Sequence, residues 1–230
     1  AKGSGMIHPN MCTMLCFVTT DAVIGSETLD KALHEAIGDT FNMVSIDGDT
    51  STNDTIAVLA NGMAETPEIL PGTPAYEEFL KGLKEICKTL SRMLAKDGEG
   101  ATKLLVCKTK GAKTEEDAKK VAKGVICSTL FKAAMFGADA NWGRVLCAIG
   151  YSGAEVDIEK VDVSFSSRAG QVDVCRMGAG IDFSEDLAKK VLSEDEIDVL
   201  VTLRDGDCAA EAYGCDLTYD YVKINGDYRT

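Results

Sequence analysis

The sequence has no apolar run that approaches the roughly 20 residues needed to cross a bilayer. It also lacks clusters of Lys and Arg: 24 basic residues stand against 37 acidic ones, which gives a formal net charge of −13. This balance argues against binding to nucleic acid or to an anionic membrane. The chain opens on Ala1-Lys2-Gly3 without an initiator Met, so we expect a chain that is processed, truncated or expressed as a piece. No signal peptide is evident, and we expect a cytoplasmic protein.

Residue patterns for metal binding are equally scarce. Only two histidines occur, and the nine cysteines are scattered without any C-x-x-C spacing. A structural zinc site is therefore not expected. Most cysteines lie in apolar segments, where Cys behaves as a small hydrophobic residue, and this usage fits a reducing compartment.

Helical and strand patterns alternate along the chain and predict an α/β (α+β) fold. Apolar residues at four-residue spacing after Ser26 predict a helix capped by that serine. The strongest predicted helix begins at Thr73-Pro74 and ends near residue 95. Residues 14–20 read as a buried strand. Further strands are predicted at 43–47, 55–60, 101–109, 161–166, 171–175, 198–204 and 216–225, and further helices at 114–135, 139–150 and 184–192.

Three polar clusters interrupt these elements. Residues 47–54 resemble a calcium loop but fail the EF-hand template, so they form either a loop held by its own hydrogen bonds or the lining of a polar pocket. Residues 97–103 are either a glycine helix end with incidental charges or part of a site. Within 141–144, Trp142 anchors a helix to the core or Arg144 pairs with a carboxylate.

Thr13 follows a glycine-containing stretch and directly precedes an apolar segment. A threonine is a poor nucleophile within a chain, but at a chain N-terminus its free α-amine can act as its base. A cut between Cys12 and Thr13 would therefore create a catalytic group. A pair of Thr13 with His8 is an alternative without an evident orienting acid, and His34 reads as structural.

Taken together and in this order, several segments closely resemble the C-terminal half of the glutamate/ornithine N-acetyltransferases, bifunctional proteins of arginine biosynthesis. The resemblance covers essentially the whole chain. It is carried by residues 2–7, 10–15, 44–55, 97–103, 136–150 and 221–230.

The resemblance implies a layered sandwich of helices and mixed sheets of the ornithine acetyltransferase/DmpA type. It implies that residues 1–12 end an α chain and that residues 13–230 form a β chain, released by self-cleavage between Cys12 and Thr13. Thr13 would carry acetyl from N-acetylornithine to glutamate by a ping-pong mechanism, with acetyl-CoA as an alternative donor and no metal or organic cofactor. The implied substrate contacts are Lys2, Thr13, Glu99, Asn225 and Thr230.

Two departures from the family pattern concern activity. Cys12 stands where family members usually have Ala, and most of the α portion is absent from this sequence. In the family that portion supplies a Thr-Gly oxyanion hole. Because losing one oxyanion donor typically costs about 10²–10³-fold in rate, we expect this chain alone to be nearly inactive. Its implied partner is the α chain of the same precursor, in an α2β2 heterotetramer.

Two other functions compete with acetyl transfer. An aminopeptidase or amidase with an N-terminal nucleophile would release the acyl group to water. A non-catalytic subunit would complete a separately encoded α chain and would not cut itself.

Overall fold

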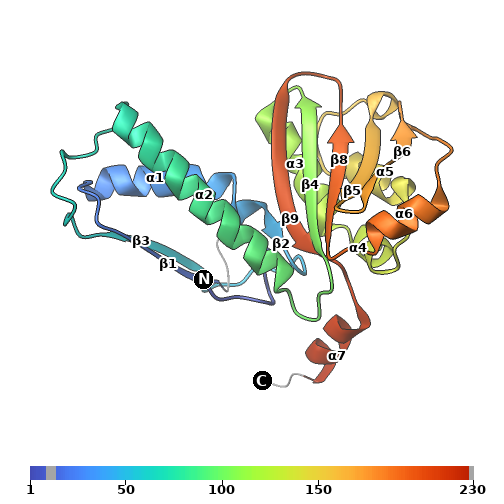
Figure 1. Ribbon diagram of the computed structural model, residues 1–230, viewed down its shortest axis with the longest axis horizontal. Coiled ribbons are helices and arrows are strands. Elements are labelled where there is room, and N and C mark those ends of the chain that lie inside the picture. Colours follow the sequence, from blue (N-terminus) through green and yellow to red (C-terminus); the bar gives the residue numbers. More distant parts are fainter. Residues whose placement is uncertain (9–13, 228–230) are drawn as a thin grey trace.

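The computed structural model describes residues 1–8 and 14–227 of the chain, and the structural account concerns those residues. Figure 1 shows an elongated molecule with a narrower N-terminal part, a broad β-sheet part and a projecting C-terminal helix. Within the described residues no helix is both long enough and apolar enough to cross a membrane.

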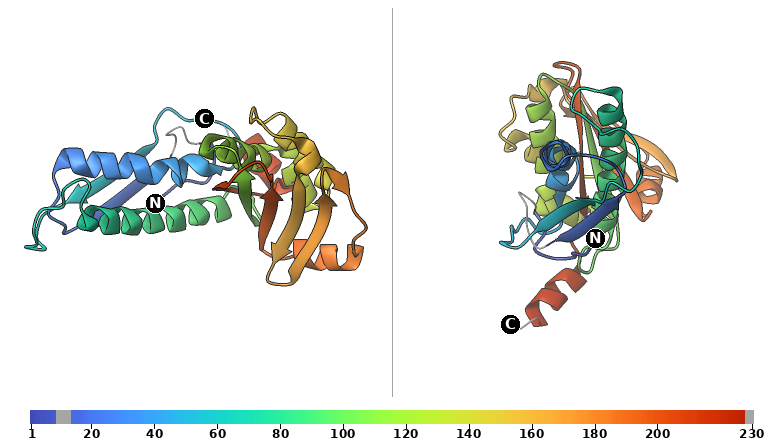
Figure 2. Two further views of the ribbon diagram at one scale, coloured as in Figure 1. Left: turned by 90° about the horizontal axis from the view of Figure 1, so that it is seen from above. Right: turned by 90° about the vertical axis from the view of Figure 1, so that its left-hand side faces the viewer.

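The N-terminal part is a pair of parallel strands covered on one face by two helices. Strands β1 (Leu15–Thr20) and β3 (Thr55–Ala60) pair from Leu15–Thr55 to Thr20–Ala60. Helices α1 (Ser26–Gly38) and α2 (Pro74–Lys96) lie side by side over this pair (Figures 1 and 2). The expected strand at 14–20 forms, but only alternate residues face the helices. Phe17 is 63% exposed on the open face, so the expectation of a buried strand was wrong.

The larger part is a mixed seven-stranded sheet in the order β2-β9-β4-β8-β5-β6-β7. Pairs β2/β9 and β4/β8 are parallel, and the other neighbours are antiparallel. The mixed sheet with its helices confirms the predicted α/β class. The strands are Val44–Ser45 (β2), Leu104–Ala112 (β4), Asp162–Ser167 (β5), Gly170–Arg176 (β6), Ala179–Gly180 (β7), Glu196–Thr202 (β8) and Cys208–Cys215 (β9).

Four helices pack on one face of this sheet. Alternate strand residues such as Leu105, Phe165 and Val199 form a single buried core with these helices, as the period-two pattern of strands requires. Short 3₁₀ turns occupy Phe41–Met43 and Ile158–Lys160. The helices are α3 (Glu115–Cys127), α4 (Thr129–Phe136), α5 (Trp142–Gly150) and α6 (Glu185–Leu192).

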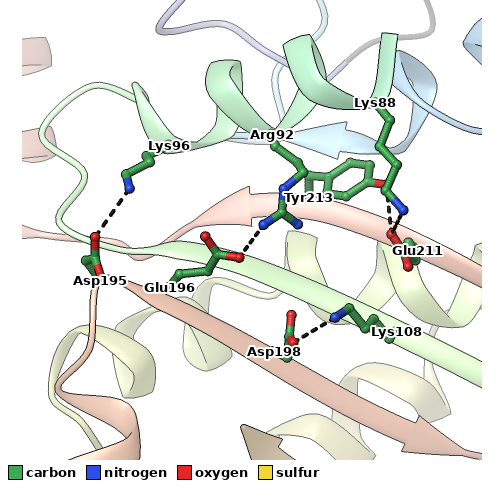
Figure 3. A network of polar contacts seen from close by, with 9 residues as sticks. All are labelled: Lys88, Arg92, Lys96, Lys108, Asp195, Glu196, Asp198, Glu211 and Tyr213. Atoms are coloured by element: carbon green, nitrogen blue, oxygen red, sulfur yellow. Dashed lines mark hydrogen bonds and ion pairs between the residues drawn. The ribbon is translucent and has the colours of Figure 1, made fainter. Parts of the chain in front are cut away.

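The C-terminal half of α2 docks beside the opposite face of the large sheet through cations spaced four residues apart. Lys88 pairs with Glu211 at 2.8 Å, Arg92 pairs with Glu196, and Lys96 pairs with Asp195 at 3.3 Å (Figure 3). Since residues four apart share one helix face, this single row of side chains orients α2 across the sheet. The Tyr213 hydroxyl donates to Glu211 at 3.0 Å in the same network.

The predicted starts of two helices are confirmed, and two other predictions about helix boundaries were wrong. Thr73 caps α2 and Thr114 caps α3 through bonds from Tyr76 N and Asp117 N, at the positions where these two helices are predicted to begin. Ser26 does not cap α1: Gly25 occupies the N-cap position without a side-chain bond. The single helix expected at 114–135 is two helices, because extended Ser128 ends α3 and its hydroxyl accepts from Phe131 N to start α4.

The C-terminal prediction was wrong in type. Residues 208–215 form β9, which the sequence analysis missed because its small residues have little β preference. The expected strand at 216–225 is instead helix α7 (Tyr219–Asp227). The Thr218 hydroxyl accepts from Tyr221 N at 3.2 Å and starts this helix. No side chain of α7 is buried, because this helix projects from the body (Figure 1).

The cysteines among the described residues are free thiols, and most lie in the core. Burial raises the pKa of the Cys107 thiol to about 12 and that of Cys215 to about 11. Thiols with such pKa values are neutral near pH 7 and pack as apolar side chains.

Candidate active site

The first eight residues lie along the edge where β1 and β3 begin. Lys2 forms an isolated antiparallel bridge with Leu15, with N–O distances of 2.8 and 3.0 Å between their backbones. Ile46 N donates to Ile7 O at 2.7 Å. These backbone bonds hold residues 2 and 7 against the body, so the described residues on both sides of the predicted cut have fixed positions.

Asp47 anchors the segment before the predicted cut. Its carboxylate accepts from Met6 N at 2.6 Å and from Ile7 N at 3.0 Å. Tyr221 of α7 reaches the same carboxylate, with its hydroxyl 3.4 Å from Asp47 Oδ2. Burial, followed by the nearby negative charge of Asp47, raises the pKa of Tyr221 to about 12. Tyr221 is therefore a neutral donor near pH 7.

Residues 47–54 form both local and distant contacts. Asp49 N donates to Asp47 Oδ1 at 3.3 Å, and Asn53 N donates to Ser51 Oγ at 3.3 Å, as in a loop held by side-chain bonds. Thr50 Oγ1 donates to His8 O at 3.1 Å, which ties the loop to the N-terminal segment. The loop is therefore held partly by its own side chains and also contacts the residues that precede the predicted cut.

Glu99 lies where the N-terminal segment meets α7. Its backbone N donates to Ser4 O at 2.9 Å, and Asn225 Nδ2 donates to its Oε2 at 2.9 Å. A Cβ atom added to Gly5 would lie 2.5 Å from the carboxyl carbon of Glu99. Only glycine allows the segment to approach this carboxylate so closely.

The cluster at 97–103 also allows α7 to approach the body. Gly100 has φ +66, and a Cβ atom there would lie 2.6 Å from Tyr221 N. Thr218 Oγ1 donates to Gly100 O at 2.7 Å. Asp97 is the C-cap of α2 and Gly98 follows it, as in a glycine helix end, but Gly98 does not have the positive φ of a left-handed cap.

The six expected site residues differ in what the structure can say about them. Lys2, Glu99 and Asn225 are described: Glu99 and Asn225 are in contact, and Lys2 is fixed through its backbone beside Leu15. Their roles in substrate binding stay predictions. The expected nucleophile and the two remaining residues lie outside the described residues: Cys12, Thr13 and Thr230.

His8 has partners of its own among the described residues. Its Nδ1 lies 3.0 Å from Ser45 Oγ and 3.6 Å from Cys127 Sγ. Burial lowers the pKa of His8, and the charge on Lys123 lowers it further, against the opposing effects of Asp47 and Asp49. The imidazole is therefore neutral near pH 7 and belongs to this polar cluster.

The cluster at residues 141–144 is structural. Trp142 packs against the core, and its indole fills the space in which Gly180 lacks a side chain. The Arg144 guanidinium donates to Leu130 O at 2.6 Å, so among the described residues it bonds a backbone carbonyl in place of the expected carboxylate.

Sequence reasoning missed three charged residues near this region. Asp54 accepts from Met14 N, directly after the predicted nucleophile. Lys132 is 3% exposed, and its ammonium donates to Ile46 O, beside Asp47. Asp216 accepts from Thr102 N at 2.8 Å and from Lys103 N at 2.9 Å. Of these three residues, Lys132 alone is signalled by the sequence, since it lies in an otherwise apolar helix and charged residues are rarely buried without partners.

Known proteins resemble the chain over its full length. The ArgJ family model matches residues 1–230. The arginine biosynthesis bifunctional protein ArgJ of Caldanaerobacter subterraneus is 56% identical over all 230 residues, and ArgJ 1 of Clostridium acetobutylicum is 54% identical. The chain spans only 57% and 56% of these two relatives.

A solved structure agrees with the sequence relatives. The crystal structure of the arginine biosynthesis bifunctional protein ArgJ from Bacillus halodurans matches with a TM-score of 0.88 and 44% identity, over 94% of this chain and 100% of that chain. The agreement of family model, sequence relatives and solved fold leads to one conclusion: the chain belongs to the ArgJ family.

Proposed function

We propose that this chain is the C-terminal half of a glutamate/ornithine N-acetyltransferase. Residues 1–12 are the end of the α chain, and residues 13–230 are the β chain released by self-cleavage between Cys12 and Thr13. Thr13 then carries an acetyl group from N-acetylornithine to glutamate, in the cytoplasm. The proposal includes acetyl-CoA as a second donor to be tested and requires no metal or organic cofactor.

One observation carries the proposal. In a chain that matches the ArgJ family throughout, Glu99 contacts both the segment that leads to Thr13 and Asn225 of the C-terminal helix.

The proposed chemistry is ping-pong acyl transfer. The Thr13 hydroxyl attacks the amide carbonyl of N-acetylornithine, and the free α-amine of Thr13 takes the hydroxyl proton. Ornithine leaves with a proton, and an acetyl ester remains on Thr13. The amine of glutamate then attacks this ester, which restores the hydroxyl.

The charges around the site suit two amino-acid substrates. The Glu99 carboxylate can accept hydrogen bonds from a substrate ammonium group, and the Lys2 ammonium can bind a substrate carboxylate. The Asn225 amide holds Glu99 in place with its Nδ2 at 2.9 Å. We assign binding to Lys2, Glu99 and Asn225, and to Thr230 by its place in the family motif.

The proposal includes a partner. The chain spans little more than half of its curated relatives, so the α portion is expected to supply the oxyanion hole and further substrate contacts. We propose an α2β2 heterotetramer. The loss of one oxyanion donor costs about 10²–10³-fold in rate, so this chain without its α portion is expected to be nearly inactive.

Mass spectrometry of the complete gene product after incubation with N-acetylornithine tests both steps. We expect a fragment that starts at Thr13 and an acetyl adduct on that residue. Thr13→Ala should remove both the cut and the adduct, because the hydroxyl is the nucleophile in each. An uncut Thr13→Ala protein that still transfers acetyl would refute the proposal.

Adding glutamate to the same incubation and analysing the small-molecule products separates the rival functions. An amidase would release acetate to water and would not acetylate glutamate. A non-catalytic subunit would stay uncut even with the α portion present. Replacing N-acetylornithine with acetyl-CoA shows whether the second donor loads Thr13.

A further inference from the structure

Asp54 and Met14 lie at the same edge of the small parallel sheet. Strand β1 begins at Leu15 and β3 begins at Thr55, and these two residues are register partners. Parallel strands start at a common edge, so the residues just before them are neighbours. Thr55 N donates to Met14 O at 2.7 Å, which fixes the register there.

The two oxygens of the Asp54 carboxylate have different surroundings. Oδ1 accepts from Met14 N, whose nitrogen is bonded to the carbonyl carbon of Thr13. Oδ2 is buried and has no hydrogen-bond partner among the described residues. A buried carboxylate oxygen is stabilised by a hydrogen-bond donor, so Oδ2 favours a donor such as a hydroxyl on a neighbouring residue.

Self-cleavage requires a base that the finished enzyme does not need. Before the cut, the nitrogen of Thr13 is part of the Cys12–Thr13 peptide bond and cannot act as an amine base. Another group must then accept the proton of the attacking hydroxyl. The Asp54 carboxylate accepts a hydrogen bond from Met14 N, in the peptide group that follows Thr13, so it is a candidate for this base.

Resting on the proposed self-cleavage, we propose that Asp54 is the general base of the cut. Asp54 accepts the Thr13 hydroxyl proton as the oxygen attacks the Cys12 carbonyl carbon. The C–N bond then breaks, and the proton passes to the Thr13 nitrogen. This leaves a free amine and an ester between Cys12 and the Thr13 oxygen. Water hydrolyses the ester to a Cys12 carboxylate and the Thr13 hydroxyl, and thereafter the free amine serves acetyl transfer.

The acidity of Asp54 suits this role. Burial raises its pKa to about 6, against the opposing effect of the bond from Met14 N. A base works best when its pKa lies near the operating pH. The titratable groups on neighbouring segments are Lys2, His8, Asp47 and Asp49, and none of them is among the causes of this shift.

The test is the pH profile of cleavage in the complete gene product. Precursor held unfolded in urea is diluted into refolding buffers between pH 5 and 8, and intact mass reports the cut. We expect the wild-type rate to fall about tenfold per pH unit below about pH 6, as the carboxylate becomes protonated. D54N keeps an oxygen that can accept from Met14 N, and should be at least about 100-fold slower with a flat profile.

The matched control is D49N, which neutralises an exposed carboxylate in the same loop and should keep the wild-type rate and profile. Circular dichroism checks refolding. Should D54N fail to refold, D54E provides the measurement: it should cut more slowly and keep the fall below about pH 6.

Two results would overturn the inference. If the wild type is cut and D54N is cut at the same rate with the same pH dependence, Asp54 is not the base, and the proposed function stands. If the wild type is never cut, both the self-cleavage and the role of Asp54 are wrong.

Discussion

Gly5 is the residue whose replacement tests the site most directly. A Cβ atom there would lie 2.5 to 2.6 Å from all three carboxyl atoms of Glu99. Gly5→Ala should displace this flexible carboxylate and weaken its bond with Asn225. We expect KM for the amino-acid substrate to rise about tenfold, equivalent to about 1.4 kcal/mol of binding, with a smaller change in kcat.

Steady-state kinetics of the complete gene product measure this effect. Gly38→Ala is the control, because nothing lies within 4 Å of a Cβ atom at the end of α1. The control should keep the wild-type KM. An unchanged KM in Gly5→Ala would contradict the role assigned to Glu99.

The candidate site residues differ in how the sequence signals them. Lys2, Glu99 and Asn225 are predicted through a resemblance spread over long motifs. Asp54 and Lys132 were missed because their partners, Met14 and Ile46, are 40 and 86 residues away along the chain. Periodicity and spacing report on neighbours within a few turns, so they carry no information about contacts at such separations.

At the scale of elements, Ser128 decides where one helix becomes two. Its hydroxyl caps α4 through Phe131 N, and the residue is buried. Ser128→Ala should lower the free energy of unfolding by about 1 kcal/mol, the usual cost of losing such a cap. Urea denaturation measures the change. Ser26→Ala is the control and should change stability by less than about 0.5 kcal/mol, because Ser26 is exposed and makes no cap bond. A Ser128→Ala protein as stable as this control would refute the cap.

The elements that were predicted correctly carry local signals. Thr73 with Pro74, and Thr114 with Asp117, mark helix starts by chemistry that acts within one turn. The elements that were wrong depend on distant partners. Strand β9 is held between β2 and β4, which override the weak preference of its small residues, and the expected strand at 216–225 is instead helix α7, which lies outside both sheets.

At the scale of the whole molecule, Asp39 joins the two parts. It follows α1 and pairs at 2.7 Å with both Lys84 of α2 and Lys119 of α3. Burial opposes the charge on Asp39, but the bonds from Lys119 and Lys84 outweigh it and lower its pKa. A carboxylate with a lowered pKa stabilises the fold above its unfolded pKa of about 4, and this contribution is lost as the pH falls through the folded value.

Asp39→Asn should therefore cost about 1 kcal/mol at pH 7 and much less at pH 3, where the wild-type carboxylate is protonated as well. Thermal unfolding at the two pH values measures this difference. Asp30→Asn is the control, since Asp30 is exposed and its one ion pair among the described residues is with exposed His34. A cost for Asp39→Asn that is equal at both pH values would refute the electrostatic link.

The anchors on either side of the predicted cut give a severed chain an unusual property. Lys2 is bound to Leu15, Ser4 to Glu99, and Met6 and Ile7 to Asp47, and each bond joins the leading segment to a part of the molecule beyond residue 13. A cut would therefore leave the two sides of the nick associated, because residues 2–7 stay bound to the part of the molecule beyond residue 13. Lys2 would then belong to a separate polypeptide that these hydrogen bonds hold in place, and dilution alone would not readily remove it.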